Sequence, residues 1–317
     1  MSSSDAVQAI DAARALGEVL LARMDALLSR IEARWPLPPA LPDWSAVIAC
    51  RWKKRGGQGF LAPVRQTHPL RLADLTSIDA QKARVVANTR QFLEGKPANN
   101  ALLTGTRGSG KSSLVKALLN EFAREGLRLI EVDRDDLIDL ADIIDLIAGR
   151  PEKFLIFCDD LSFESGENTY KALKSALDGS IAAPPENTLI YATSNRRHMM
   201  PEYFSDNLET IRADNGEIHP GEAVEERVSL SDRFGLWVSF YPFDQESYLA
   251  IVARWLRTFG FNAKEISARE REALNWALAR GSRSGRVAWQ FARDCAGKAG
   301  KSGAGRRKKS ARKKARN

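Results

Sequence analysis

Residues 105–112, Gly105-Thr-Arg-Gly-Ser-Gly110-Lys111-Ser112, form the stretch that decides the fold. A short apolar run, residues 101–104, comes directly before it, and residues 111–125 show the apolar spacing of a helix after it. The order of glycines, lysine and serine fits the pattern G-x-x-x-x-G-K-[ST] at a strand-to-helix turn. The stretch therefore predicts a phosphate loop, meaning a turn whose backbone N–H groups close around phosphate oxygens.

Each residue type in the phosphate loop has a physical reason to be there. Glycines let the amides turn inward, and the start of the following helix adds the positive end of its dipole. We expect Lys111 to neutralise the β and γ phosphates of a nucleotide and the Ser112 hydroxyl to ligate magnesium. ATP and Mg²⁺ are the predicted cofactors. The other residues expected to contact the nucleotide are Gly105, Thr106, Arg107, Gly108, Ser109, Gly110 and Ser113. The alternative is a glycine-rich turn with an exposed lysine.

Two aspartates follow a second apolar run, residues 154–158. Such a run is typical of a buried central strand, and its carboxyl end points toward a phosphate loop in an open parallel sheet. We expect Asp159 to hold the metal and Asp160 to act as the general base toward water. The alternative for both aspartates is a helix cap, and Glu164 is a competing base.

Short apolar runs alternate with helical patterns along the middle of the chain, which predicts an α/β fold with a parallel sheet covered on both faces. The expected strands are 101–104, 127–132, 154–158, 189–193 and 237–241, and the expected helices are 111–125, 135–148 and 169–177. Only helical patterns follow, at 245–259, 268–280 and 286–295. Residues 7–35 predict an amphipathic helix, and residues 44–70, with their mixed signals, predict an irregular connector.

These segments resemble the AAA+ ATPases and, more closely, the bacterial family known as domain of unknown function 815. The resemblance extends from about residue 72 to residue 291, through GTRGSGKSS, FCDDLSFE, YATSNRRH, SLSDRFGLWVSFYPF and RGSRSGRVAWQF. It implies an AAA+ core with a parallel sheet between helices, a C-terminal helical lid and an N-terminal helical extension. The expected domains are 1–70 (extension and connector), 71–243 (core), 244–297 (lid) and 298–317 (basic tail without fixed structure).

The resemblance also assigns roles outside the phosphate loop. Asn195 looks like sensor 1, which places the attacking water, although a strand-end Asn is also a common turn residue. Arg233 looks like the arginine finger that acts on a neighbouring subunit, and so implies a nucleotide-dependent homo-oligomer. Arg286 looks like sensor 2, with Arg283 as the alternative. Leu75 and Ile78 resemble the residues that sandwich adenine, or are ordinary core. The acidic pair departs from the common Asp-Glu, which puts fast hydrolysis in doubt.

Composition limits the remaining possibilities. The formal charge of +8 comes from the tail, because residues 298–317 hold ten Lys or Arg and no acid, which leaves 38 basic against 40 acidic residues elsewhere. The three cysteines form no paired motif, which predicts a reducing compartment. No apolar run reaches the roughly 18 residues of a membrane span, and the first residues are unlike a signal peptide. We expect a soluble, cytoplasmic protein.

Two functions fit these features. The first is an ATP-hydrolysing machine that assembles through its nucleotide and remodels an unknown protein partner. The second is a switch in which ATP binding changes the affinity for nucleic acid or protein with little turnover. The basic tail motivates the second, since lysine and arginine neutralise nucleic-acid phosphates, although such tails are also plain solubilising segments. The long segment 198–229 is either a partner contact or a passive insertion.

Overall fold

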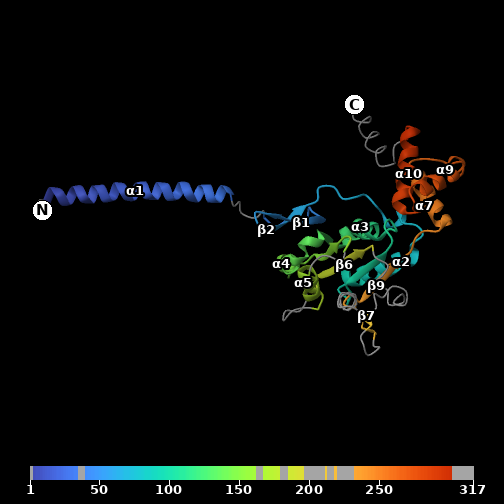
Figure 1. Ribbon diagram of the computed structural model, residues 1–317, viewed down its shortest axis with the longest axis horizontal. Coiled ribbons are helices and arrows are strands. Elements are labelled where there is room, and N and C mark those ends of the chain that lie inside the picture. The colour runs from blue at the N-terminus through green and yellow to red at the C-terminus, as the bar shows by residue number, and fades with distance from the viewer. Residues whose placement is uncertain are drawn as a thin grey trace. The chain divides into compact units, whose positions relative to one another are not determined.

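The computed structural model describes residues 3–34, 40–161, 167–178, 185–195, 211–212, 218–219 and 232–301. They fall into two compact units, one within Met1–Pro42 and Lys53–Leu61 and the other within Asp43–Trp52 and Ala62–Asn317. In the first unit, α1 (Ser3–Arg34) is a single long helix (Figure 1). The first unit also holds residues 53–61, and the described helices other than α1 belong to the second unit.

A seven-stranded sheet forms the centre of the second unit, in the order β2-β1-β4-β5-β6-β3-β9. Five neighbouring pairs run parallel: β1 with β4, β4 with β5, β5 with β6, β6 with β3, and β3 with β9. The strands are β1 (Ala49–Arg55), β2 (Gln58–Pro63), β3 (Ala101–Gly105), β4 (Leu127–Val132), β5 (Lys153–Cys158), β6 (Thr188–Ser194) and β9 (Leu236–Phe240). The five strands predicted from apolar runs are therefore confirmed, each within about one residue at its ends.

Helices cover the sheet because the apolar residues of the inner strands alternate toward both faces. All residues of β3 are buried, as are residues 154–158 of β5. One core joins alternate residues of these strands, among them Leu103, Leu155 and Tyr191, to helices α2 (Asp79–Leu93) and α3 (Lys111–Phe122). The remaining elements of this region are η1 (Leu72–Asp74), η2 (Ala123–Glu125), η3 (Arg134–Asp139), α4 (Leu140–Ile147) and α5 (Glu167–Asp178). The predicted α/β class with a parallel sheet is thus confirmed.

One prediction about the chain's amino-terminal third is wrong. Residues 44–70 are not wholly irregular, because β1 pairs with β4 with Cys50 opposite Ile130 and Arg51 opposite Glu131. Cys50 and Trp52 are buried, whereas Arg51 is exposed and bonds Glu131 at 2.6 Å. The exposed charged residues of β1 and the turn at Gly56 hid this strand, because only Ala49, Cys50 and Trp52 of it are buried.

Four helices follow β9 and share a second core. They are α7 (Gln245–Thr258), α8 (Ala263–Ser267), α9 (Glu270–Ala279) and α10 (Gly285–Lys298). Asp244 caps α7 by accepting a bond from Ser247 N at 2.8 Å, and Ser284 caps α10 by accepting from Val287 N at 3.3 Å. Tyr248 and Phe291 are fully buried between these helices. No strand after β9 occurs among the described residues, as the sequence predicted.

Two short strands lie in the segment that separates β6 from β9. Strand β7 (Ile211–Arg212) pairs antiparallel with β8 (Ile218–His219). Most of the predicted insertion 198–229 lies outside the described residues, as does the tail from residue 302 onward. Within the described part of the chain, no helix is both long enough and apolar enough to span a membrane.

Candidate functional site

The candidate site lies where the phosphate loop joins β3 to α3. Strands β5 and β6 are parallel to β3 in the same sheet, so their carboxyl ends lie at the same edge as the loop. This topology brings Asp159, Asp160 and Asn195 to the loop although they are 47 or more residues away in sequence. The predicted grouping of the loop, the two aspartates and the asparagine is what the structure shows.

Two glycines of the loop are required by close contacts. A Cβ on Gly105, which has φ +130°, would lie 1.9 Å from the carbonyl oxygen of Phe240 on β9. A Cβ on Gly108, at φ +74°, would lie 2.8 Å from the Cβ of Ser284. Glycine avoids both overlaps and adopts these dihedral angles without strain. The loop therefore packs closely against β9 at Gly105 and against Ser284 at Gly108.

Lys111 is the most buried charged group of the site, with 4% of its surface exposed. Its Nζ donates to the carbonyl oxygens of Gly105 at 2.7 Å and Thr106 at 2.9 Å, and to Asn195 Oδ1 at 3.0 Å. Burial lowers the pKa of this lysine to about 8, against the opposing attraction of Asp159 and Asp160. Burial therefore disfavours the charged form of Lys111 at the loop, and a negative charge placed beside it would favour that form again.

Ser112 and Asp159 form the second part of the site. The Ser112 hydroxyl donates to Asp159 Oδ1 at 2.5 Å, and Thr193 Oγ1 donates to the same oxygen at 2.7 Å. Thr193 belongs to β6, so that strand fixes the carboxylate that follows β5. Hydroxyl and carboxylate oxygens are the ligands that Mg²⁺ prefers, usually together with phosphate oxygens and water. Among the described residues there is no group of three or more His, Cys, Asp or Glu that could hold a metal ion.

Asp160 is held differently from Asp159. Its backbone is in the left-handed region, with φ +59°, and its N–H donates to Thr193 Oγ1 at 2.9 Å. Its carboxylate accepts a hydrogen bond from Asn195 Nδ2 and lies 3.5 Å from the Arg107 guanidinium. Non-glycine residues with positive φ are uncommon, and an aspartate tolerates the conformation better than most. The exposed carboxylate is thus turned to the cleft and oriented by two side chains that the sequence had also assigned to the site.

A cleft of about 580 Å³ connects these groups with the helices after β9. Leu75 and Ile78 line it, as predicted for an adenine pocket, and both also belong to the hydrophobic core, so each of the two predicted roles has an observation in its favour. Arg286, at the start of α10, lines it as well. Sequence reasoning missed several lining residues, namely His68, Asp74, Lys116, Phe243, Ile251, Trp255 and Trp289. The two tryptophan rings pack edge to face at 4.7 Å, and only their helical spacing could have hinted at them.

Two contacts join the helices after β9 to this cleft. The Gly285 N–H donates to the carbonyl oxygen of Gly108 at 2.8 Å, so the start of α10 is bonded to the phosphate loop. The Arg254 guanidinium on α7 lies 2.6 Å from Asp74, whose carboxylate also accepts from the Arg71 N–H at 3.0 Å. Both contacts involve groups on the two sides of the cleft. If these helices move relative to the sheet, the two contacts must therefore break, or their partners Gly108 and Asp74 must move as well.

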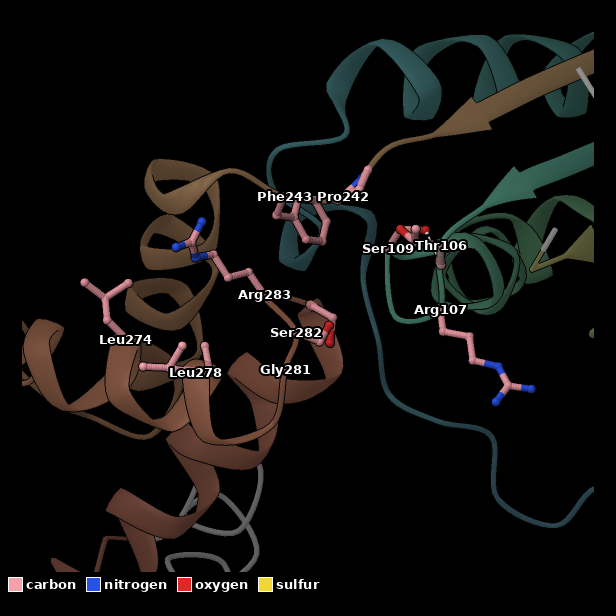
Figure 2. A pocket seen from close by; sticks show the side chains of 12 residues that line it. Thr106, Arg107, Ser109, Pro242, Phe243, Leu274, Leu278, Gly281, Ser282 and Arg283 are labelled. Atoms are coloured by element: carbon pink, nitrogen blue, oxygen red, sulfur yellow. Dashed lines mark hydrogen bonds between the residues drawn. The ribbon is translucent and has the colours of Figure 1, made fainter. Parts of the chain in front are cut away.

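Arg283 lies elsewhere than Arg286. It lines a second hollow of about 490 Å³, between the loop residues Thr106 and Ser109 and helix α9. Figure 2 shows Leu274, Leu278 and Arg283 on one side of this hollow and Thr106 and Ser109 on the other. Arg286 thus shares a cleft with Lys111 and Asp159, whereas Arg283 does not line that cleft, and the role predicted for either arginine stays a prediction.

Arg233 and Glu164 are not among the described residues that line the cleft, for different reasons. Arg233 precedes β9, is half-buried, and is not among the described residues that line the cleft. A residue that acts on a neighbouring subunit need not lie there. Glu164, the alternative base, lies outside the described residues.

The pKa of Lys111 makes a prediction about nucleotide binding. At pH 8 the lysine is about half protonated, and polyphosphate beside it would raise its pKa by favouring the ammonium form. We expect ATP binding at pH 8 to take up a fraction of a proton, and this fraction to shrink toward pH 6.5, where the lysine is already charged. Calorimetry in buffers of different ionisation enthalpy measures the uptake. Proton release at pH 8, or uptake that is unchanged in Lys111→Met, would contradict the assignment.

Known proteins resemble this chain in sequence and in structure. A family model described as "Protein of unknown function (DUF815)" matches residues 45–299. The large subunit of replication factor C from Staphylothermus marinus is 37% identical over 76 residues, which are 24% of this chain and 17% of that protein. The same subunit from Thermofilum pendens is 40% identical over 70 residues, or 22% and 16% of the two chains. The matched segments thus span about a sixth of these relatives.

Solved structures show similarity at low sequence identity. The Thermotoga maritima RuvB Holliday junction branch migration motor has a TM-score of 0.46 at 16% identity, covering 69% of this chain and 61% of that one. The FIGL-1 AAA domain in complex with ADP has a TM-score of 0.47 at 15% identity, covering 73% and 74%.

Proposed function

The chain belongs to the family described as protein of unknown function (DUF815), and on that premise we propose that it binds Mg-ATP at the phosphate loop and hydrolyses it. The predicted resemblance to this family is thereby confirmed, and both the AAA+ character and the activity belong to the proposal. One observation carries it: Ser112 and Asp159 share a 2.5 Å hydrogen bond directly beside the buried ammonium group of Lys111. These groups together suit a polyphosphate with its divalent cation.

The residues present fit ATP and magnesium. Lys111 supplies the single buried positive charge among the described residues of the loop, and Ser112 with Asp159 supplies hard oxygen ligands. When bound, magnesium neutralises phosphate charge. Arg286 lines the same cleft and is proposed to contact the nucleotide from α10. Leu75 and Ile78 are proposed to contact the base, with the apolar lining of the cleft around them.

We assign water activation to Asp160. Asn195 donates to its carboxylate, and Arg107 lies on the other side, so the carboxylate is held at the mouth of the cleft. A carboxylate in hydrogen-bond reach of water accepts its proton as the oxygen attacks the terminal phosphate. Asn195 contacts both Lys111 and Asp160, which places one amide between the phosphate-binding ammonium and the base. Its role is to orient, as proposed for sensor 1.

The assignment of Arg233 to a neighbouring subunit makes the proposed enzyme a homo-oligomer. The 71–243 core and the 244–297 lid are the proposed moving parts, and the ties at Gly285 and Arg254 connect them. Nucleotide turnover would then be coupled to assembly and to remodelling of a partner protein.

Mixing two inactive variants tests this arrangement. Lys111→Ala has an intact Arg233 and a defective site, whereas Arg233→Ala has an intact site and no finger. If Arg233 acts on a neighbour, about a quarter of the sites in a randomly assembled equal mixture combine Lys111 with a neighbouring Arg233, so the mixture should release phosphate at roughly a quarter of the wild-type rate. The background is low because an arginine finger contributes about 10³-fold or more to such reactions. Either variant alone should be near background, and Arg271→Ala, which changes an exposed arginine on α9, should behave as wild type. A mixture no more active than its components would defeat the proposed assembly.

The alternative function is a binding switch with little turnover. The observation that favours it is the double restraint on Asp160, whose side chain is one bond shorter than glutamate and is engaged by Asn195 and Arg107. Tight ATP binding by the wild type without phosphate release would support this function over hydrolysis. In that case the tail can be tested as a nucleic-acid contact. The wild type and a variant that lacks residues 302–317 are compared for their retention on immobilised DNA and RNA at low salt.

A further inference from the structure

Helix α1 carries a continuous apolar surface. Eight large apolar side chains between residues 16 and 31 are each more than half exposed, and they are Leu16, Val19, Leu20, Leu21, Met24, Leu27, Leu28 and Ile31. The helix lies outside the residues that the family model matches. A lone helix cannot bury its own stripe against itself, so a surface of this size indicates a partner.

Six of the eight apolar residues follow a seven-residue repeat, and Leu16 and Val19 fall outside it. With Met24 at position a, Gly17 and Ile31 also fall at a, and Leu20 and Leu27 fall at d. Leu21 and Leu28 then fall at e, beside this seam. Spacing of this kind is that of helices that pack side by side with their a and d side chains interlocked.

The charges beside the seam differ between its two flanks. Arg23 and Arg30 are at position g, on one flank, whereas Glu18 and Asp25 are at position b, on the other. Arg14 is the exception on the acidic flank, where it pairs with Glu18 within the helix at 3.8 Å. In a parallel pair the g flank of one helix faces the e and b flank of the next, so arginine meets acid. In an antiparallel pair like flanks face each other, so arginine would meet arginine.

From this pattern we propose that α1 is a self-association helix, which packs in parallel and in register against α1 of a second copy of this chain. Arg23 of one copy then lies opposite Asp25 of the other, on both sides of the seam. A lipid surface suits the helix less well, because residues 14–31 hold three arginines and two acids and the flank opposite the arginines is acidic, whereas membrane-surface helices carry basic polar faces. The contact needs no nucleotide, so it stands or falls independently of the proposed ATPase.

Cysteine cross-linking of the full-length protein without nucleotide tests the proposal. Leu27→Cys places a thiol at position d, where the two copies of residue 27 meet only in a parallel, in-register pair. The chain's own Cys50, Cys158 and Cys295 are buried and burial raises their pKa values, to about 12 for Cys50 and Cys158, so they should not compete. Under mild copper-phenanthroline oxidation we expect mostly disulfide-linked dimer. Ser29→Cys, at the outward position f, is the matched control and should remain mostly monomer on a non-reducing gel.

Charge reversal supplies the second measurement. Arg23→Glu with Arg30→Glu should weaken association by about tenfold or more, as measured by light scattering over a dilution series, because like charges then flank the seam. Adding Asp25→Arg should recover part of the loss, which simple unfolding of α1 would not. A wild-type monomer at all concentrations, or a Leu27→Cys variant that stays uncrosslinked, would overturn the proposal and indicate instead that α1 packs within its own chain.

Discussion

A Lys111→Ala variant should release phosphate from ATP at least about 100-fold more slowly than the wild type. Removing one preorganised donor from a developing negative charge costs about that much in enzymes studied by mutagenesis. Here the donor is buried, and it donates to the carbonyl oxygens of Gly105 and Thr106 and to the Asn195 amide oxygen. Without it the site would hold polyphosphate against two nearby carboxylates with no compensating positive charge at that position. Steady-state phosphate release, with calorimetric ATP binding beside it, measures both effects.

Two controls keep the interpretation of this variant clear. Lys264→Ala removes an exposed lysine from α8 and should leave turnover unchanged. Lys111→Met keeps most of the side-chain volume and should be as inactive as the alanine variant, which separates loss of charge from loss of packing. Equal turnover in Lys111→Ala and wild type, with both proteins folded, would remove the basis of the proposed function.

A Gly105→Ala variant should lose about 3 kcal/mol or more of folding free energy, or fail to fold. The new Cβ would lie 1.9 Å from the Phe240 carbonyl oxygen, and that backbone is held by the pairing of β3 with β9. Overpacking of a rigid site typically costs 1–3 kcal/mol, and a left-handed φ adds about 1–2 kcal/mol for a residue with a Cβ. Urea unfolding followed by circular dichroism measures the difference.

Gly126→Ala is the matched control for this effect. Gly126 has φ +97°, yet nothing lies within 4 Å of a Cβ built there, so only the dihedral strain applies. We expect a loss of about 1 kcal/mol. Similar losses in the two variants would show that β9 yields to the added methyl group, contrary to the close packing described for the loop.

Local patterns were enough to predict the centre of the fold. The apolar runs that became β3, β5 and β6 are almost wholly buried, and such strands read as unbroken apolar sequence. Strands β4 and β9 mix buried with half-buried residues but are still largely apolar. The phosphate loop was equally legible, because glycine spacing and a following lysine report backbone geometry directly. Asp159, Asp160 and Asn195 could be grouped with it because parallel strands end at a common edge.

Other parts of the site depend on contacts between segments far apart in the chain, which a periodicity does not encode. Trp255 and Trp289 have helical spacing that fits an ordinary core, and nothing in it says that they also line the cleft. The pairing of Arg254 with Asp74 joins residues 180 positions apart. Strand β1 was hidden because its exposed charges and single buried tryptophan look like loop composition. In each case tertiary packing decided what local sequence left open.

The bond between Gly285 and Gly108 constrains which sequences this fold can accept. It joins a main-chain N–H to a main-chain carbonyl, so exchange of side chains nearby leaves donor and acceptor in place. Proline is the one residue that removes the donor, and the first position of a helix is where proline is otherwise welcome. At Gly285, the first residue of α10, that general tolerance is cancelled. A proline at this position would therefore remove the bond between α10 and the phosphate loop, although the helix itself would accept it.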